Sequence, residues 1–422
     1  MTDVVAASAR SSSGDSCALS LGQVSVWRDI RELHAEVQAR TVLADSFSVA
    51  PHTGERDLRC ALEQLAARHE ILRTRFERGD AGARPRQRIL ALEEVELPLT
   101  CEEVGDEANP LARLRRRPLP LWTGLPWSAA LVTRGGVADH VVVVVHHLGT
   151  DAHGLTVLVQ DLARLLAGEA LADTTSHGAR TLVELETRSA GLRSAERALR
   201  RWRSALAEGF PPAPDHDRVL EATLRSCDLR DTVVQRSEEE RVPVSAVLLH
   251  AFVSALERTD GDGGRRVLRT MVSNRLGEDR ARIVTSMNQW APIVLPVEGA
   301  SLAEVARELM LAMRAGVYDV EELERVLGAE GLDPRDLDFL PSFNLVQLAA
   351  APVDSGGARP CAPCRGTHVQ TERMPLATGP RFYFRALWSD QLRLVLRVPE
   401  EPGAEAVLQQ TLLLIERRLR SA

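Results

Sequence analysis

Regularly spaced apolar residues divide the chain into alternating helices and strands. Apolar positions three or four residues apart are typical of amphipathic helices, and they predict helices over residues 21–33, 57–72, 155–166, 182–207, 245–256, 302–316 and 404–419. A charged segment predicts a further helix over 106–117. Strands are predicted from residue 74, as a pair within 84–99, and over 138–147, 266–272, 343–348, 382–387 and 392–396.

The clearest strand is Ala138–His147, with the sequence ADHVVVVVHH. Five consecutive β-branched valines favour a strand, and the absence of polar alternation predicts that both of its faces are buried. The helix that follows a short turn is expected to stop at Gly168, because glycine is common just after a helix end. This strand and helix therefore anchor the predicted fold of the first half.

The order of the elements predicts two lobes that both mix strands and helices. A chain of 422 residues is long for one core. Residues 209–217 contain three prolines and predict a linker. We therefore expect a disordered N-terminus over 1–18, an N-terminal lobe over 19–208 and a C-terminal lobe over 218–422. The predicted fold class is α/β (α+β).

Composition narrows the possible functions. The net charge is −7, which argues against general binding to nucleic acid. The longest apolar run is far shorter than a membrane-spanning helix, and no signal peptide is expected, so we predict a cytoplasmic protein. All 52 basic residues are arginine, and six cysteines are too few for a disulfide scaffold.

The most informative stretch is His146-His147-Leu148-Gly149-Thr150-Asp151. Successive side chains of a strand point to opposite faces, so only one histidine can face a given site. Imidazole is a natural base near neutral pH. A structural histidine, and an Asp151 that merely caps the next helix, remain the alternative interpretation at this point.

Together with its flanking segments, this motif resembles the condensation domains of nonribosomal peptide synthetases, which are chloramphenicol-acetyltransferase-like acyltransferases. The family motif HHxxxDG is represented by His146, His147 and Asp151. Further segments agree in order: LSLGQVSVW from residue 19, RHEILRTRF over 68–76, RRWRSALAEG over 200–209, VPVSAVLLHAFVSAL over 242–256 and SNRLGEDRARIVTSMNQWAPIVLPV over 273–297. The resemblance covers residues 19–419, nearly the whole chain.

The resemblance implies a V-shaped pseudo-dimer of two lobes with the active site in a tunnel between them. It implies that His147 is the catalytic residue and that His146 and Asp151 are structural. It also implies that Asp151 forms an ion pair with Arg275 and that this pair connects the two lobes beside the active site. The residues that it places along the tunnel are Ala152, His153, Gly154, Asn288, Trp290 and Asn344.

The sequence departs from the family pattern within this motif. Ala152 replaces the glycine of HHxxxDG, which is acceptable only if its backbone φ is negative. His153 and Gly154 stand where the family usually has Trp and Ser, and the segment 284–287 reads Val-Thr-Ser-Met instead of Val-Gly-Phe-Phe. We expect these changes to alter the substrate more than the reaction.

The function implied is that of a free-standing condensation enzyme. Such an enzyme joins an acyl group, held as a thioester on the phosphopantetheine arm of a carrier protein in trans, to an amine or an alcohol. His147 would remove or position the proton of the acceptor. No metal and no cofactor bound by the chain itself is expected.

Three alternatives stay open. A coenzyme A-dependent acyltransferase of the same superfamily is one, although the DFGWG motif of its plant branch is absent. An epimerisation domain is a second, although its Ser-Trp continuation and later glutamate motif are absent. A catalytically inactive platform domain is the third, although His147 is intact. The acyl donor, the acceptor, amide versus ester product and the oligomeric state are not readable from the sequence.

Other candidate sites are weaker. Cys361-x-x-Cys364 with His368 has zinc-ligand spacing, but two thiols in a loop are the plainer interpretation. The run Arg115-Arg116-Arg117 is either a solvated surface or a docking point for an acidic carrier protein. The GDGG stretch over 261–264 lacks the Lys-Ser/Thr of a phosphate loop and predicts a turn.

Overall fold

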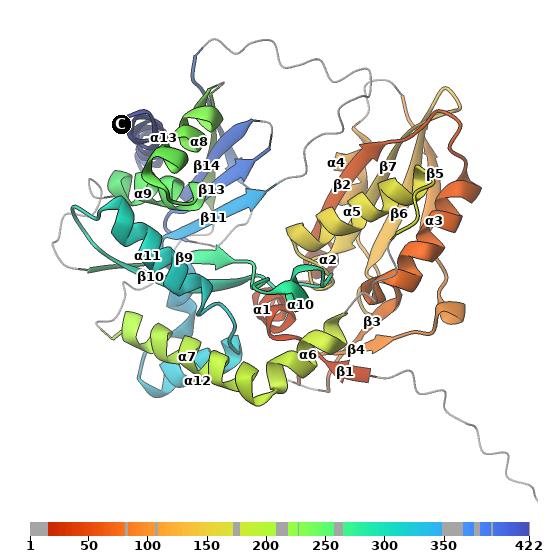
Figure 1. The fold of residues 1–422 in the computed structure, drawn as a ribbon, viewed down its shortest axis with the longest axis horizontal. Coiled ribbons are helices and arrows are strands. Elements are labelled where there is room, and N and C mark those ends of the chain that lie inside the picture. The colour runs from red at the N-terminus through yellow and green to blue at the C-terminus, as the bar shows by residue number, and fades with distance from the viewer. Residues whose placement is uncertain are drawn as a thin grey trace, which may run out of the picture.

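The computed structural model describes residues 16–80, 83–105, 109–171, 178–207, 218–226, 228–256, 265–347, 366–374, 380–389 and 391–421. The predicted linker, the GDGG turn and the Cys361/Cys364 pair lie outside these residues. None of the described helices is both long and apolar enough to cross a membrane. The chain forms two lobes of mixed strands and helices, which confirms the predicted fold class (Figure 1).

The N-terminal lobe is built on a four-stranded sheet in the order β2-β7-β6-β5. Its strands are β2 (Val42–Ser48), β7 (Val137–His146), β6 (Trp127–Arg134) and β5 (Leu99–Glu103). Val141–Val145 of β7 are all buried, as the valine run predicts. Val141, Val143 and Val145 pack with α3 (Glu55–Arg68) and α5 (Ala152–Leu166), whereas Val142 and Val144 face α4 (Pro110–Arg115).

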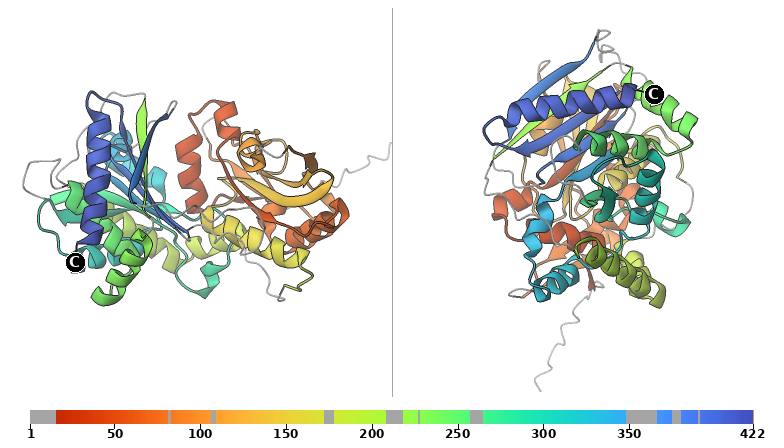
Figure 2. Two further views of the ribbon diagram at one scale, coloured as in Figure 1. Left: turned by 90° about the horizontal axis from the view of Figure 1, so that it is seen from above. Right: turned by 90° about the vertical axis from the view of Figure 1, so that its left-hand side faces the viewer.

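The C-terminal lobe is built on a seven-stranded sheet in the order β10-β9-β11-β13-β14-β8-β12. These strands are β10 (Gln289–Pro296), β9 (Arg265–Val272), β11 (Ser342–Gln347), β13 (Tyr383–Trp388), β14 (Leu392–Pro399), β8 (Val219–Arg225) and β12 (His368–Met374). One face is covered by α8 (Leu229–Glu240), α9 (Val244–Leu256), α11 (Leu302–Met313) and α13 (Ala404–Arg420). The other face is turned toward the N-terminal lobe (Figure 2).

Three predictions about local structure were wrong. Ser16–Ala18, expected to be disordered, form strand β1, which pairs with β4 (Arg86–Ile89). The segment 84–99 is not a strand pair, because β4 pairs with β1 and β3 (Thr74–Glu77) while β5 pairs with β6. The helix expected over 182–207 is two helices, α6 (Ala179–Thr187) and α7 (Ser189–Ala205), separated by the extended residue Arg188.

Two helices connect the lobes at their base. Arg201 of α7 donates hydrogen bonds to Glu308 of α11 and to the carbonyl of Pro292 in β10, so α7 packs on the C-terminal sheet although it precedes the predicted linker. Helix α12 (Val320–Ala329) packs against α1 (Leu21–Ile30). The short helices α2 (Ala35–Ala39) and α10 (Glu278–Ala281) lie beside the site described next.

Candidate active site

The two adjacent histidines have different surroundings because they lie at the end of β7, His146 as its last residue and His147 directly after it, where successive side chains point to opposite faces of the sheet. His146 is completely buried. Its Nδ1 accepts a hydrogen bond from the backbone N–H of Leu148 at 3.0 Å, so its Nε2 carries the proton that is donated to the carbonyl of Gln38 at 2.7 Å. Burial lowers the pKa of His146 to about 4, which keeps the ring neutral.

His147 is only half-buried and lies toward the C-terminal lobe. Its Nδ1 lies 3.0 Å from the carbonyl oxygen of Thr150. A carbonyl oxygen can only accept, so Nδ1 carries the proton and Nε2 of the neutral ring has a free lone pair. Nε2 has no hydrogen-bond partner in the part of the chain that the structure describes. The backbone thus fixes the tautomer that can act as a base through Nε2.

Ser286 of the C-terminal lobe holds the backbone of His147. Its hydroxyl donates a short hydrogen bond to the carbonyl of His147 and lies 3.4 Å from Nδ1 of the same residue. The first turn of α1 passes directly beneath this serine. A Cβ atom on Gly22 would lie 2.4 Å from the carbonyl oxygen of Ser286, so only glycine permits this close approach.

The ion pair that the resemblance implies is present between Asp151 and Arg275. Nη1 and Nη2 of Arg275 lie 2.7 Å and 2.9 Å from the two carboxylate oxygens. Asp151 is fully buried, and the Arg275 side chain is 5% exposed. The aspartate also caps α5 through the N–H of Gly154 and accepts from the N–H of Met287 in the C-terminal lobe. Asp151 therefore caps the N-terminus of α5 and also connects the two lobes.

Asn274, next to Arg275, holds the same segment in an unusual conformation. Its φ is +57°, a region that asparagine tolerates better than most residues. Its side-chain amide donates to the carbonyls of Met287 and Gly316, at 2.8 Å each. Arg275 donates in addition to the carbonyls of Ser273, Ile283 and Thr285. These bonds fix the position of the C-terminal-lobe segment that approaches the histidines.

Residues 152–154, expected to line a tunnel, occupy three different environments. Ala152 is the first residue of α5 and has a negative φ, so its methyl group is accommodated. His153 is exposed and its Nε2 lies 3.2 Å from the carbonyl of Ala281 across the lobes. Gly154 is buried, and a Cβ there would lie 2.3 Å from Oγ1 of Thr150. The absence of a side chain at Gly154 therefore allows the first turn of α5 to pack against Thr150.

The other expected tunnel residues lie on the C-terminal lobe. Asn288 is half-buried just before β10. Trp290 contacts Tyr383 edge-on, with ring centroids 5.9 Å apart, and the Arg269 guanidinium lies 4.5 Å from its ring centroid. Asn344 donates to the hydroxyl of Tyr383 at 3.3 Å. Trp290 and Asn344 thus meet around Tyr383 on the sheet, apart from the backbone network of the histidines.

Sequence reasoning missed the residues that act through backbone atoms. Thr150 and Gln38 contribute carbonyl oxygens, which any residue could supply, so no side-chain signal identifies them. Ser286 was noted as a departure from the family pattern, yet its contact with His147 spans 139 positions. Arg275, which the resemblance to the family pairs with Asp151, was the sequence signal that located the C-terminal half of the site.

Comparisons with known proteins identify the family of the chain. The family described as "Condensation domain" matches residues 44–347. The beauvericin nonribosomal cyclodepsipeptide synthetase of Beauveria bassiana is 28% identical over 317 residues, covering 68% of this chain and 10% of that protein. Surfactin synthase subunit 2 of Bacillus subtilis (strain 168) is 34% identical over 146 residues, covering 34% of this chain and 4% of that protein. The chain thus spans a small fraction of these relatives.

Solved structures share the fold over nearly the whole chain. The condensation domain that mediates chain release from the enacyloxin polyketide synthase has a TM-score of 0.75 at 18% identity, with 96% of this chain and 83% of that chain covered. A mutant starter condensation domain of the rhizomide synthetase RzmA has a TM-score of 0.71 at 18% identity, with 96% and 95% covered. At these identities the likeness establishes the fold.

Proposed function

Because this chain belongs to the condensation-domain family, we propose that it joins an acyl thioester to an amine or an alcohol in natural-product biosynthesis in the cytoplasm. The acyl group is held on the phosphopantetheine arm of a carrier protein, and the reaction requires no cofactor bound by the chain itself. The observation that carries the proposal is the hydrogen bond between Nδ1 of His147 and the Thr150 carbonyl, which leaves Nε2 as a free base.

The proposed reaction is direct acyl transfer. Nε2 of His147 accepts the proton of the amine or hydroxyl as the nitrogen or oxygen attacks the thioester carbon. The tetrahedral intermediate collapses when the C–S bond breaks. The leaving thiolate then takes the proton from the imidazolium, which restores the neutral ring. The positive charge of the imidazolium supports the oxyanion while it exists.

The neighbouring groups position His147 in this proposal. His146 is held neutral by burial and ties the end of β7 to α2 through Gln38. Asp151 and Arg275 hold the segment of the second lobe that carries Ser286 against the backbone of His147. Small changes in their contacts therefore shift the base relative to a bound acceptor, and such misplacement slows a reaction that depends on alignment.

A coenzyme A thioester as the donor is the second candidate. The starter condensation domain of RzmA mentioned above was solved in complex with C8-CoA. The phosphopantetheine arm is common to coenzyme A and to carrier proteins, so the same channel would accept either. The two candidates differ in whether the surface around the site recognises a protein.

One assay separates these candidates. The same acyl group is offered on a holo-carrier protein, on coenzyme A and on N-acetylcysteamine, with wild type and His147→Ala. We expect kcat/KM to be highest for the carrier form and to fall with added salt, because docking of an acidic carrier is electrostatic. Equal kcat/KM on carrier and coenzyme A without salt dependence would favour the coenzyme A enzyme.

The histidine substitution tests the mechanism in both cases. We expect His147→Ala to lose at least about a hundredfold in kcat, a typical contribution of a general base, with an unchanged melting temperature. Near-wild-type turnover by folded His147→Ala would contradict the proposed chemistry and favour a non-catalytic platform.

A further inference from the structure

The seven-stranded sheet presents a charged face toward the N-terminal lobe. Ala222 and Leu224 of β8 and Leu394 and Leu396 of β14 lie in the core beneath α9 and α13. Because side chains alternate along a strand, the arginines and glutamate at the intervening positions lie on the opposite face. Figures 1 and 2 show that this face is turned toward α5 and the N-terminal sheet.

At one end of these strands the charges are compensated. Glu221 of β8 is directly opposite Arg397 of β14, and its Oε2 accepts from Nη2 of Arg397 at 2.7 Å and from Nη2 of Arg385 at 2.5 Å. The Tyr383 ring lies beside both guanidiniums, 5.5 Å and 5.9 Å from its centroid. Two cations thus share one carboxylate and an aromatic face.

Four residues further along the same two strands, the compensation is absent. Arg225 is directly opposite Arg393, and His368 of β12 is opposite Arg225 on its other side. Among the described residues, neither Arg225 nor Arg393 has an ion-pair partner or a hydrogen-bond partner for its side chain. Burial and the nearby charge of Arg225 lower the pKa of Arg393. Like charges directly opposite each other in a sheet are destabilising.

We propose that Arg225 and Arg393 form a binding site for an anionic group, a carboxylate or a phosphate, of a substrate that enters between the lobes. Two planar guanidiniums side by side offer the paired N–H groups that these oxyanions bind. A bound anion would remove the repulsion that the sheet otherwise carries. This inference rests on the proposed function, because it assigns the anion to the substrate of that site.

The location fits a substrate that reaches His147. Arg393 is opposite Leu387 of β13, and Leu387 is opposite Val346 near the end of β11. Strand β11 in turn contacts α5, the helix that Asp151 starts. Neighbouring strands are about 4.8 Å apart, so Arg393 lies roughly 10 Å across the sheet from β11. The anion of this proposal is either a carboxylate on the acceptor or the phosphate of the pantetheine arm.

Binding measurements without turnover test the proposal. Wild type, Arg225→Gln, Arg393→Gln and the double variant are titrated calorimetrically with phosphopantetheine and with pantetheine, and separately with hexanoate and hexanamide. We expect wild type to bind the anionic member of one pair at least about tenfold more tightly and the double variant to lose that preference. The pair that shows the preference identifies phosphate or carboxylate as the source.

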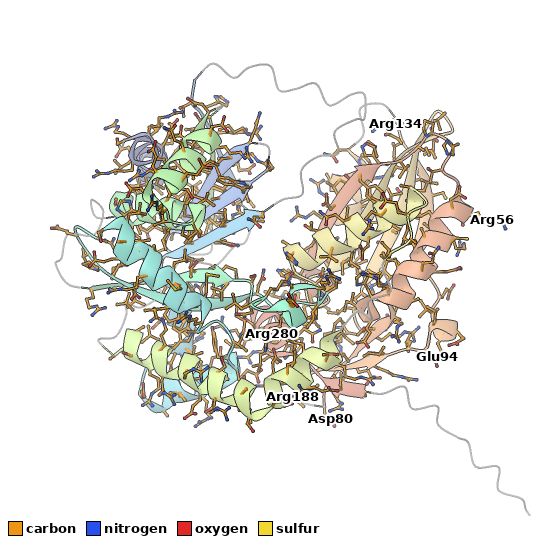
Figure 3. The ribbon with its side chains drawn as sticks, in the orientation of Figure 1. Arg56, Asp80, Glu94, Arg134, Arg188 and Arg280 are labelled. Atoms are coloured by element: carbon orange, nitrogen blue, oxygen red, sulfur yellow. The ribbon has the colours of Figure 1, made fainter. Side chains whose placement is uncertain are left out.

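A matched control is Arg56→Gln. Arg56 is an exposed arginine on α3 at the outer edge of the N-terminal lobe (Figure 3), and its replacement should leave the anion preference intact. Thermal melts in inorganic phosphate give a second readout, in which the stabilisation seen for wild type should be lost in the double variant. The proposal is overturned if neither pair shows a preference, or if the preference persists in the folded double variant. Because no turnover is measured, this result is independent of whether condensation activity is found.

Discussion

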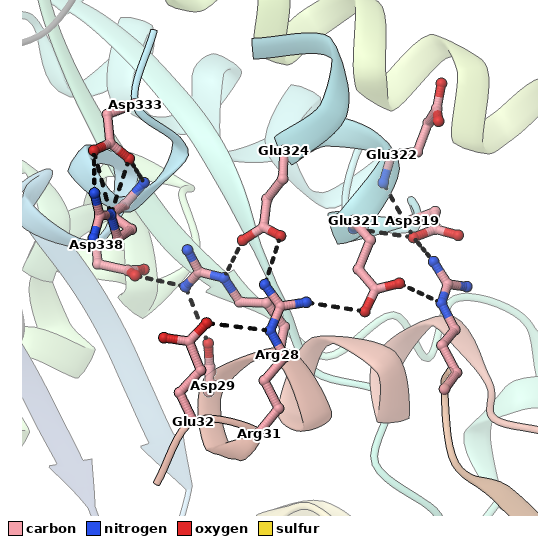
Figure 4. Close-up of polar contacts among 12 residues, drawn as sticks. Arg28, Asp29, Arg31, Glu32, Asp319, Glu321, Glu322, Glu324, Asp333 and Asp338 are labelled. Carbon is pink, nitrogen blue, oxygen red and sulfur yellow. Dashed lines mark hydrogen bonds and ion pairs between the residues drawn. The ribbon is translucent and has the colours of Figure 1, made fainter. Parts of the chain in front are cut away.

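The ionic contacts between the lobes include two groups that differ in how they are built. The Asp151–Arg275 contact at the active site is buried, and each carboxylate oxygen of Asp151 receives one guanidinium N–H and one backbone N–H. The second group links α1 to α12 and the segment after it. There Arg28 of α1 and Arg31, the residue directly after this helix, share Glu324, and Arg28 also binds Asp338 (Figure 4).

The outer group is more exposed and has more interchangeable partners. Side-chain exposures in the outer group run from 11% for Arg28 to 34% for Asp338. In the buried contact they are 5% for Arg275 and 0% for Asp151. Arg84 extends the group by binding Asp319 and Glu321. If one partner is lost there, water or a neighbouring carboxylate can replace it, whereas nothing replaces a partner inside the buried contact. The buried contact therefore fixes the positions of the two segments that it joins. The outer group mainly adds to the stability of the contact between the lobes.

The largest effect is expected for Asp151→Ala. The substitution leaves the Arg275 charge buried without its partner, which costs about 3–5 kcal/mol of unfolding free energy, and it removes the cap of α5 as well. Denaturant unfolding measures the loss, and kcat should fall because the segment carrying Ser286 is released. The double variant Asp151→Ala/Arg275→Met should recover part of the stability. A loss below about 1 kcal/mol would show that the contact is not desolvated.

A smaller effect, visible only in acid, is expected from His146. Its pKa is about 4 in the folded chain and about 6.5 when unfolded, so protons bind the unfolded state preferentially between these values. The contribution of neutral His146 to the free energy of unfolding is therefore complete above pH 6.5. It decreases by about 3 kcal/mol as the pH falls toward 4. His146→Asn should lack this acid loss, as measured by unfolding at several pH values.

Comparing wild type with His146→Asn separates the effect of this histidine from that of groups whose contribution to stability changes with pH in the opposite direction. Burial raises the pKa of Glu186, beside the N-terminus of α1, to about 7, so its contribution falls as pH rises. That contribution is common to wild type and variant and cancels in their difference. A difference that does not change between pH 7 and pH 4 would contradict the buried neutral state of His146.

The parts of the fold that the sequence predicts well are those with strong local causes. Five valines in a row determine β7 whatever surrounds them, and the alternation of a strand then separates His146 from His147. The helix break at Arg188 has no such cause. The chain turns there so that Gly191 packs against the carbonyl oxygens of Leu185 and Glu186, where a Cβ would lie 2.4 Å from each. Only the three-dimensional structure shows that Gly191 allows the chain to change direction between α6 and α7.

Pairing between strands is harder to predict than the strands themselves. The segment 84–99 looks like a local pair, but β4 finds its partners at Ser16–Ala18 and Thr74–Glu77. Likewise, Arg225 and Arg393 are separated by 168 positions in the chain, and their opposition depends on the register of β8 with β14. The resemblance to a family identified the Asp151–Arg275 contact in advance, because that contact belongs to a motif; no motif marks the arginine pair.

The smallest effects are expected in the outer ionic group. Arg28→Ala should lower the unfolding free energy by about 1–2 kcal/mol, since it loses hydrogen bonds to two carboxylates, and Arg31→Ala by less because that side chain is more exposed. Both losses should shrink in 1 M NaCl, where the screening length is about 3 Å, while the loss in Asp151→Ala should not. Arg59→Ala, which removes an exposed ion pair with Glu55 on α3, serves as the control and should be near neutral. If Arg28→Ala lowered the free energy of unfolding as much as Asp151→Ala, and with as little dependence on salt, both groups of contacts would fix the positions of the segments that they join.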